Sequence, residues 1–185
     1  MIKEIAPKVW KLNVDSNVYF LDFKEKIVID AGPKGYRAVV EEELSKVVSL
    51  DKVDRVIFTH LHYDHIGNYK LFPNAKFYAS DEEIKLLGKN KMYAIGDPLL
   101  AMKFKVKLHP LKDELGLKVI KTPGHTKGSV CLYYAKAGVL FSGDTLFFNG
   151  FGRIDFPFSD PGRMEESLEK VKRIKYKILA PGHDY

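Results

Sequence analysis

Half of the histidines in this chain lie within six consecutive residues. The segment reads T-H-L-H-Y-D-H-I-G over residues 59–67, and the whole chain has six histidines. Its candidate ligands are His60, His62, Asp64 and His65. Crowding these side chains on a loop gains a protein little stability, but imidazole nitrogens and carboxylate oxygens are ligands that zinc, iron and manganese accept. The segment therefore predicts a metal site.

The spacing within this segment also constrains where its side chains point. Alternate residues of an extended chain face the same side, so His60, His62 and Asp64 would share one direction. His65 is out of phase with them. It reaches the same region only if the chain turns there, as it would at the start of a helix.

Further titratable residues each follow a short apolar run. They are Asp30 after I-V-I, His125 after L-K-V-I-K-T-P-G, Asp144 after V-L-F-S-G and His183 after I-L-A-P-G. Functional side chains often lie on loops that a rigid scaffold positions. If these strand ends meet at one edge, the residues converge with His60 on a single place. His109, in K-L-H-P-L, stands outside this set, and we expect it to be a surface or structural histidine.

The number of candidate ligands indicates two metals. The set comprises His60, His62, Asp64, His65, His125, Asp144 and His183. One four-coordinate ion cannot use seven ligands, whereas two ions that share a carboxylate can. Two metals about 3.5–4 Å apart activate a bridging water and polarise a carbonyl or phosphoryl oxygen. The ligand set therefore predicts hydrolytic chemistry.

Short strands and two helices must position these residues. Apolar runs bounded by turn residues predict strands at 17–22, 27–29, 56–58, 76–79, 117–120, 130–134, 139–141 and 178–180. Helical spacing predicts helices within 37–49 and 161–174, the second with Asp160 as N-cap and Pro161 at its first position. This mixture indicates an α/β (α+β) fold of stacked or mixed sheets covered by helices, and one domain over residues 1–185.

Composition indicates which kinds of partner the protein binds and in which cellular compartment it lies. The net charge of +6 is spread along the chain, which favours anionic small molecules and not nucleic acid, whose binding needs clustered basic residues. No apolar run approaches the ~20 residues of a membrane span, and no signal peptide is evident, so we expect no membrane partner. The single cysteine, Cys131, suits a reducing cytoplasm and is expected to be buried in a strand. Nothing in the sequence indicates an oligomeric state.

Taken together, the motifs resemble those of the metallo-β-lactamase-fold hydrolases. The segment T-H-L-H-Y-D-H is similar to the family's H-x-H-x-D-H signature. The other family motifs follow in order, as I-D-A-G at 29–32, T-P-G-H-T-K-G-S at 122–129, S-G-D-T-L-F at 142–147 and P-G-H-D-Y at 181–185. The resemblance implies a four-layer αβ/βα sandwich, with two mixed sheets packed face to face and helices outside.

The same resemblance implies a role for each residue. The first metal would be held by His60, His62 and His125, and the second by Asp64, His65 and His183, with Asp144 bridging both. Asp64 and Asp144 would also be catalytic. Asp30 resembles an outer aspartate that orients a ligand or loop, because a ligating histidine needs an acceptor for its other ring N–H. The implied cofactors are two divalent ions, zinc first, with iron or manganese as alternatives. Their bound water would be the nucleophile.

Within the family, the chain most resembles the short glyoxalase II-like (hydroxyacylglutathione hydrolase-like) group. G-H-D-Y is similar to that group's G-H-E-Y, and D-T-L-F-F-N-G-F-G-R-I-D resembles its segment after the bridging aspartate. This implies that Tyr185 and Arg153 bind the substrate, a small anionic acyl thioester such as S-lactoylglutathione. Arg153 could instead form an ion pair with Asp155. The resemblance ends at Tyr185 and does not include the helical extension that supplies further glutathione contacts in longer members.

Other activities remain open on the same residues. The G-R-x-D-F pattern also occurs in persulfide dioxygenases, which oxidise their substrate with one iron held by two histidines and an aspartate. Lactonases and phosphodiesterases of the family share the first motif. A flavin-linked diiron protein is disfavoured, because it would carry Glu at the position of His62. A metal-binding domain without catalysis is disfavoured, because all seven ligands are present.

Overall fold

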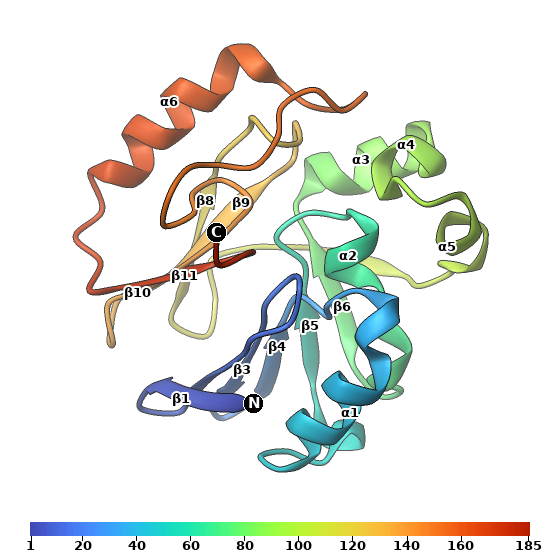
Figure 1. The fold of residues 1–185 in the computed structure, drawn as a ribbon, viewed down its shortest axis with the longest axis vertical. Coiled ribbons are helices and arrows are strands. Elements are labelled where there is room, and N and C mark those ends of the chain that lie inside the picture. The colour runs from blue at the N-terminus through green and yellow to red at the C-terminus, as the bar shows by residue number, and fades with distance from the viewer.

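Two β-sheets form the centre of the molecule, and helices lie against their outer sides (Figure 1). The structure is a computed structural model that describes every residue from 1 to 185. The first sheet has seven strands in chain order: β1 Ile2–Ala6, β2 Val9–Leu12, β3 Val18–Asp22, β4 Lys26–Ile29, β5 Arg55–Ile57, β6 Lys76–Ala79 and β7 Leu108–Pro110. The second has four, in the spatial order β11 Ile178–Pro181, β10 Val139–Gly143, β9 Val130–Tyr134 and β8 Leu117–Lys121.

Six α-helices connect or cover the strands. They are α1 Arg37–Ser45, α2 Tyr63–Ile66, α3 Asp81–Lys89, α4 Lys91–Ile95, α5 Pro98–Lys103 and α6 Pro161–Lys172. Short 3₁₀ turns lie at Lys34–Tyr36, Leu50–Lys52 and Tyr69–Leu71. In Figure 1, α6 lies on the side of the second sheet, and the other helices lie on the side of the first.

Alternation along the strands explains the layers. In β4, Ile27 and Ile29 belong to the apolar core that also contains Phe141 of β10, so they face the second sheet. Val28 points the other way, into a second core with Val40 of α1. On the outer face of the second sheet, Cys131 is fully buried in a small cluster with Val171 of α6. The fold predicted from the sequence, a four-layer αβ/βα sandwich, is therefore confirmed.

The strands expected from the sequence are all present, each within two residues of its predicted ends. The helices are shorter than expected, because α1 ends at Ser45 and α6 at Lys172. Asp160 occupies the N-cap position of α6, but its side chain makes no capping hydrogen bond. Its backbone N–H donates instead to the carbonyl of Gly124, 2.8 Å away, which ties the start of α6 to the loop that carries His125.

Several elements were not expected from the sequence. Strands β1 and β7 are partly exposed and have no clear alternation of apolar residues, and β2 is only four residues long. Helices α3, α4 and α5 are short, and their starts depend on local caps. Ser80, for example, accepts a hydrogen bond through its side chain from the backbone N–H of Glu83.

Strand direction brings the candidate residues to one edge. Strands β4, β5, β6 and β7 run parallel to one another, and so do β10 and β11. Asp30 follows the carboxyl end of β4, and His60 lies just beyond that of β5. Asp144 and His183 lie just beyond β10 and β11. Parallel strands present their carboxyl ends at the same edge, where open α/β sheets bind ligands.

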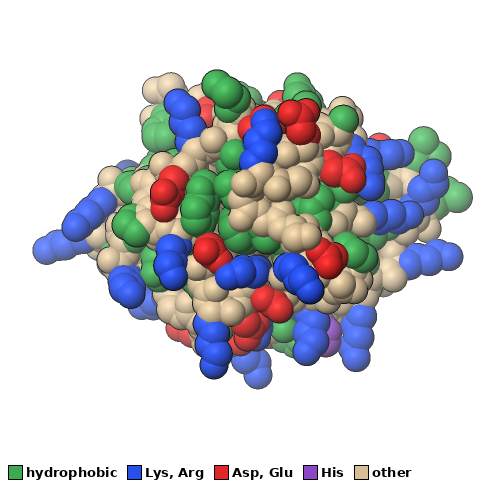
Figure 2. Space-filling model, turned by 90° about the horizontal axis from the view of Figure 1, so that it is seen from below, with side chains coloured by type: hydrophobic (Ala, Val, Ile, Leu, Met, Phe, Trp, Pro, Cys, Tyr) green, Lys and Arg blue, Asp and Glu red, His purple; other side chains and the backbone are tan.

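Two further observations concern the charge of the surface and the apolar character of the helices. On the face seen in Figure 2, Lys and Arg side chains are interspersed with Asp and Glu side chains. This agrees with the charge distribution expected from the sequence. None of the helices combines the length and the apolar character that crossing a bilayer requires.

Candidate metal centre

The structure brings the seven predicted ligands together in two groups of three around one carboxylate. In the first group, the ligand atoms of His60, His62 and His125 all lie within 4.8 Å of one another. The second group meets the same limit and comprises Asp64, His65 and His183. All six side chains are largely buried. The family resemblance named these two groups for the two metals, and a third set, His60, His65 and Asp144, meets the same limit.

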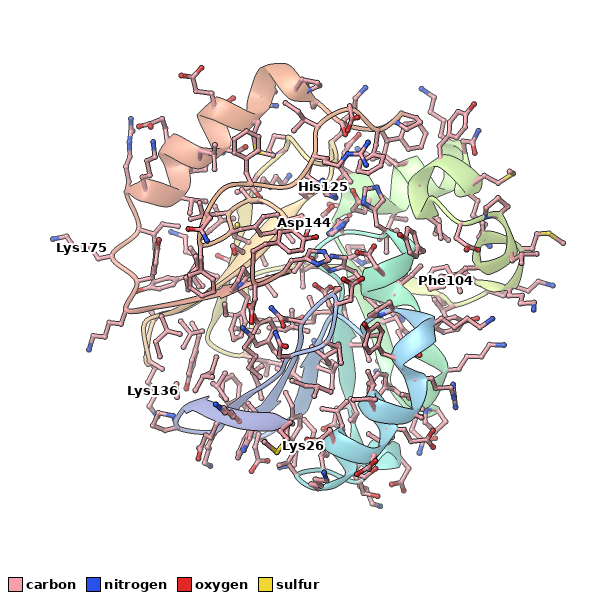
Figure 3. All side chains as sticks on the ribbon, in the orientation of Figure 1. Lys26, Phe104, His125, Lys136, Asp144 and Lys175 are labelled. Atoms are coloured by element: carbon pink, nitrogen blue, oxygen red, sulfur yellow. The ribbon has the colours of Figure 1, made fainter.

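Asp144 contacts both groups. Its Oδ2 lies 3.5 Å from His125 Nε2 of the first group and 3.6 Å from His183 Nε2 of the second. Its Oδ1 lies 3.2 Å from His65 Nε2. Figure 3 shows Asp144 and His125 next to each other, where the ends of the two sheets meet. The carboxylate therefore has the position that a bridging ligand needs.

The rings of four histidines are oriented through Nδ1. The four Nδ1 contacts are His60 with Thr59 Oγ1 at 3.2 Å, His65 with Asp30 Oδ2 at 2.8 Å, His125 with Arg153 O at 2.6 Å and His183 with Asp15 O at 2.7 Å. Each ring therefore turns Nε2 toward the centre. His62 is reversed, because its Nδ1 lies 2.8 Å from His125 Nε2. Such contacts fix ring orientation at metal sites.

Asp30 supports the centre without belonging to either ligand group. It is buried and adopts a left-handed backbone conformation, with φ of 56° directly after β4. Its carboxylate accepts hydrogen bonds from the Thr59 backbone N–H at 2.9 Å, from the Thr59 hydroxyl at 2.8 Å and from His65 Nδ1. One side chain thus holds both a ligand and the loop before the histidine motif.

The position of Asp64 differs from the sequence prediction. The extended part of the motif ends at His62, which is the N-cap of α2, so Asp64 does not continue the line of His60 and His62. The helical turn points it to the second group instead. Its Oδ2 lies 3.3 Å from His183 Nε2 and 3.7 Å from His65 Nε2. The same turn brings His65 to the centre, as the sequence required.

Burial keeps the first group uncharged. It lowers the pKa of His60 well below the ordinary value, that of His62 to about 3, and that of His125 to a lesser extent. The neighbouring imidazoles add to this effect at His60 and His62. Neutral imidazoles have a free lone pair for a metal, so this group is ready to bind a cation at neutral pH.

Nearby carboxylates and imidazoles determine the pKa values of the second group. Burial lowers the pKa of His65, but the charges of Asp144 and Asp30 outweigh burial, and the pKa is raised well above its usual value. Burial raises the pKa values of Asp64 and Asp144, yet His65 and His183 together with the other nearby imidazoles outweigh it, and both carboxyls are shifted down. The carboxylates therefore stay ionised beside a cationic imidazole.

The centre fits divalent metal ions. Two of its buried polar atoms, His65 Nε2 and Asp144 Oδ1, have no hydrogen-bond partner, although buried polar atoms are normally paired. Gly182 also leaves room that a side chain would fill. A Cβ there would collide with the Asp144 carboxylate and lie 2.9 Å from the His65 ring. Imidazole and carboxylate donors suit zinc, iron and manganese.

Glu83 is a supporting residue that the sequence did not reveal. It lies on α3, its exposed fraction is 1%, and its carboxylate accepts hydrogen bonds from the Leu61 backbone N–H at 3.0 Å and from the Thr126 hydroxyl at 2.5 Å. Leu61 lies between two ligands, and Thr126 follows His125. Glu83 therefore ties together the two loops that carry the first group. The only signal in the sequence is the spacing of Ser80 and Glu83. A serine that caps the start of a helix is often followed by a glutamate three residues later.

An open cavity of about 870 Å³ leads to the centre. Both predicted substrate-binding residues line it. Arg153 also makes the alternative contact expected from the sequence, because it donates two hydrogen bonds to Asp155, at 3.0 and 2.8 Å. Tyr185 is exposed, and its ring stacks on that of His183 with centroids 5.0 Å apart.

Two other predictions concern residues outside the centre. His109 lies on β7, with its ring 5.5 Å from that of Tyr78, and it joins neither ligand group. Cys131 is buried in β9 as expected, and burial raises the pKa of its thiol to about 11. Neither residue takes part in the centre.

Comparisons with known proteins agree with this geometry. The model of the metallo-beta-lactamase superfamily matches residues 13–183, which include every predicted ligand. A probable metallo-hydrolase of Methanocaldococcus jannaschii is 33% identical over 192 residues, covering 95% of this chain and 92% of that protein. A hydroxyacylglutathione hydrolase of Francisella philomiragia is 31% identical over 185 residues, covering 96% and 67%. A protein crystallised in a di-iron-bound form has a similar fold, with a TM-score of 0.74, 24% identity and coverage of 95% and 91%.

Proposed function

This chain belongs to the metallo-beta-lactamase superfamily and is a metal-dependent hydrolase, and we propose that it uses two metal ions to cleave a small acyl thioester. The observation that carries the two-metal proposal is the position of Asp144. This carboxylate contacts both ligand groups, and its Oδ1 and His65 Nε2, which lie 3.2 Å apart, make no hydrogen bond. Two groups that share one carboxylate support two ions.

We assign the ligands as the two groups define them. The first ion takes His60, His62 and His125, the second takes Asp64, His65 and His183, and Asp144 serves both. When bound, the metals supply an activated water and a Lewis acid that stabilises the developing oxyanion. We propose zinc as the metal, with iron as the alternative because one similar fold was crystallised in a di-iron-bound form.

The residues of this chain position the reaction. Asp64 is the more exposed of the two carboxylate ligands that line the cavity, since 16% of its side chain is accessible, against 8% for Asp144. We assign it to accept a hydrogen bond from the attacking water and so orient that water. The ring of Phe156, 5.1 Å from that of His62 and 5.7 Å from that of His125, excludes bulk water from this side.

The thioester proposal has narrower support. The similar protein from Francisella philomiragia is a hydroxyacylglutathione hydrolase, and this chain covers 67% of its length. Tyr185 and Arg153 both line the cavity, in agreement with the motifs that resemble the glyoxalase II group. The cavity volume of about 870 Å³ suits a small-molecule substrate.

One experiment tests the metal count and the reaction together. The protein is purified, its metals per chain are measured by mass spectrometry, and it is assayed with S-lactoylglutathione and, separately, with glutathione persulfide under oxygen monitoring. Two metals per chain and release of thiol are the expected results. One iron per chain with oxygen consumption would show a persulfide dioxygenase instead. Two metals without thiol release from any thioester would leave hydrolysis of another bond, such as that of a lactone or phosphodiester.

A further inference from the structure

We infer that the substrate is a thioester whose acyl group is apolar, either aromatic or bulky alkyl, and whose thiol part lacks the charges of glutathione. This inference rests on the proposed thioester hydrolysis and specifies which thioesters the site accepts. It comes from the cavity above the metal centre, whose exposed side chains are mainly aromatic and whose charges do not match glutathione.

Exposed apolar side chains concentrate at this cavity. Of the eleven large hydrophobic residues that are exposed in the chain, five line it, with exposed fractions from 47% to 64%: Tyr63, Met92, Tyr93, Phe151 and Tyr185. Single exposed apolar residues are common on protein surfaces, but a contiguous group of them marks a binding site. The mouth of the cavity therefore offers apolar surface that a ligand would bury.

Aromatic rings also flank the ligands deeper in the cavity. Phe156 packs edge-on against His62 and His125, on the side of the first group. Phe147 lies 5.7 Å from His183 and 5.4 Å from Tyr185, on the side of the second. A carbonyl that reaches the centre must have its substituents beside these rings. Aromatic walls bind flat or bulky apolar groups through buried area and ring contacts.

The charges of the cavity do not favour the carboxylates of glutathione. Apart from the metal ligands, its lining contains two charged side chains, Arg153 and Asp15. Arg153 is already bound to Asp155 through two hydrogen bonds, and its guanidinium lies over the Phe156 ring at 4.7 Å. Asp15 adds negative charge at the mouth. Arg153 is thus the single cationic side chain of the lining apart from the ligands, and a substrate carboxylate would have to compete with Asp155 for it.

The shape of this surface indicates a small molecule as the occupant. The exposed aromatic residues face a cavity of about 870 Å³ and not a flat area. Pockets for small ligands typically have volumes of about 300–1,000 Å³ and mostly apolar walls. The cavity also ends at the ligand atoms, so whatever fills it lies within reach of the reaction.

Four thioesters test the inference. Lactoyl and phenylacetyl groups are each attached to glutathione and to N-acetylcysteamine, an uncharged thiol, and kcat/KM is measured with the metal-loaded protein. We expect phenylacetyl-N-acetylcysteamine to exceed S-lactoylglutathione by at least tenfold, mainly through a lower KM. Equal or better use of S-lactoylglutathione overturns the inference but leaves the proposed thioesterase intact.

A binding measurement keeps the test valid if no thioester is cleaved. That result would overturn the proposed function, whereas the inference concerns what the cavity binds. Calorimetric titration of the metal-loaded protein compares two uncleavable thioethers, S-benzyl-N-acetylcysteamine and S-methylglutathione. At least tenfold tighter binding of the benzyl compound supports an apolar cavity. Equal or tighter binding of the glutathione compound overturns it.

Substitutions locate the effect. Tyr93→Ala and Phe151→Ala should each raise the KM for phenylacetyl-N-acetylcysteamine roughly five- to tenfold, because each ring contributes buried apolar area. The KM for the lactoyl analogue should change less than twofold. Tyr36→Ala is the matched control, since Tyr36 is 45% exposed but lies outside the cavity. Equal effects of all three substitutions, or similar effects on both substrates, would contradict the inference.

Discussion

At the scale of single residues, the metal centre depends on which ring nitrogen each histidine leaves free. His60, His65, His125 and His183 engage Nδ1 with a neighbour and direct Nε2 inward, whereas His62 directs Nδ1 inward. Of the four groups that contact these Nδ1 atoms, two are side chains, those of Thr59 and Asp30. Arg153 and Asp15 contribute main-chain carbonyls, so substitution of their side chains leaves the orienting contact in place.

Asp144→Asn tests the bridging assignment. The amide keeps the size of the side chain but removes the charge that both groups of ligands share. We expect metal content to fall from two ions per chain to one or fewer, and kcat to fall at least about 100-fold, because charge stabilisation at the reacting centre is lost. Asp81→Asn, at the exposed start of α3, is the control. Unchanged metal content and activity would refute the assignment.

Glu83 makes the stability of the protein depend on pH. Burial raises the pKa of its carboxyl to about 7, against hydrogen bonds from Thr126 and Leu61 that lower it. The ordinary value is 4.5. The folded protein therefore binds this proton more tightly than the unfolded chain does. The stabilising contribution is complete below about pH 4.5 and is lost as the pH rises through about 7, by ~3 kcal/mol at most.

Glu83→Gln should remove this dependence. Urea denaturation of the metal-free protein from pH 4.5 to 8 measures the free energy of unfolding for the wild type and the variant. We expect the wild type to lose up to about 3 kcal/mol relative to Glu83→Gln across this range. Titration of the ligand histidines is common to both proteins and cancels in the difference. Glu165→Gln, exposed on α6, should run parallel to the wild type. A parallel profile for Glu83→Gln would contradict the pKa assignment.

At the scale of elements, β11 and the residues after it are held by the protein itself. The hydroxyl of Tyr19 and the side-chain amide of Asn17 donate to the carbonyl of Pro181, at 2.7 and 3.0 Å. The backbone N–H of Asn17 donates to Gly182 at 2.6 Å, and Asn13 and Asn17 donate to the Asp184 carboxylate. These contacts anchor this segment without a metal.

Two variants separate anchoring from metal binding. A chain that ends before Pro181 should keep the first metal and lose the second, because it lacks His183. His183→Ala should lose the same metal but keep the hydrogen bonds to Asn17 and Tyr19. We therefore expect the metal-free truncated chain to unfold at least about 2 kcal/mol more easily than metal-free His183→Ala, as several buried hydrogen bonds are lost. Equal unfolding free energies would show that the segment contributes no stability of its own.

At the scale of the whole molecule, each predicted ion lies between the two sheets. Loops of the first sheet supply His60 and His62 to one group, and Asp64 and His65 to the other. The second sheet completes them with His125 and His183, and it also supplies Asp144. Bound metals would therefore link the two halves of the sandwich at the edge where the core between the sheets ends.

Metal removal should consequently lower thermal stability. A ligand present at about 1,000 times its Kd stabilises the folded state by about 4 kcal/mol, and for a domain of this size each kcal/mol shifts Tm by about 2–4 °C. We expect a chelator to lower Tm by about 8–16 °C and added zinc to restore it. Asp144→Asn should show less than half of that shift. An unchanged Tm after complete metal removal would contradict a link between the sheets.

The sequence by itself predicted eight of the eleven strands, the family and the seven candidate metal ligands. Alternating apolar runs and the turn residues that bound them are local signals, so eight strands could be placed within two residues. The ligands could be found because H-L-H-Y-D-H is dense and because every other ligand follows a strand end. The short edge strands and the helices from α3 to α5 were missed, since they depend on neighbours and caps more than on periodicity.

Residue spacing did not decide how the ligands divide, which the family resemblance implied, and only the tertiary structure decided what surrounds them. The turn at Tyr63 sends Asp64 to the second group, and no spacing rule distinguishes that turn from a continued strand. Glu83 and Tyr93 of the cavity come from segments far from the ligands in the chain. Their roles arise from burial and from contacts between distant residues, which depend on how the two sheets pack and cannot be read from local sequence.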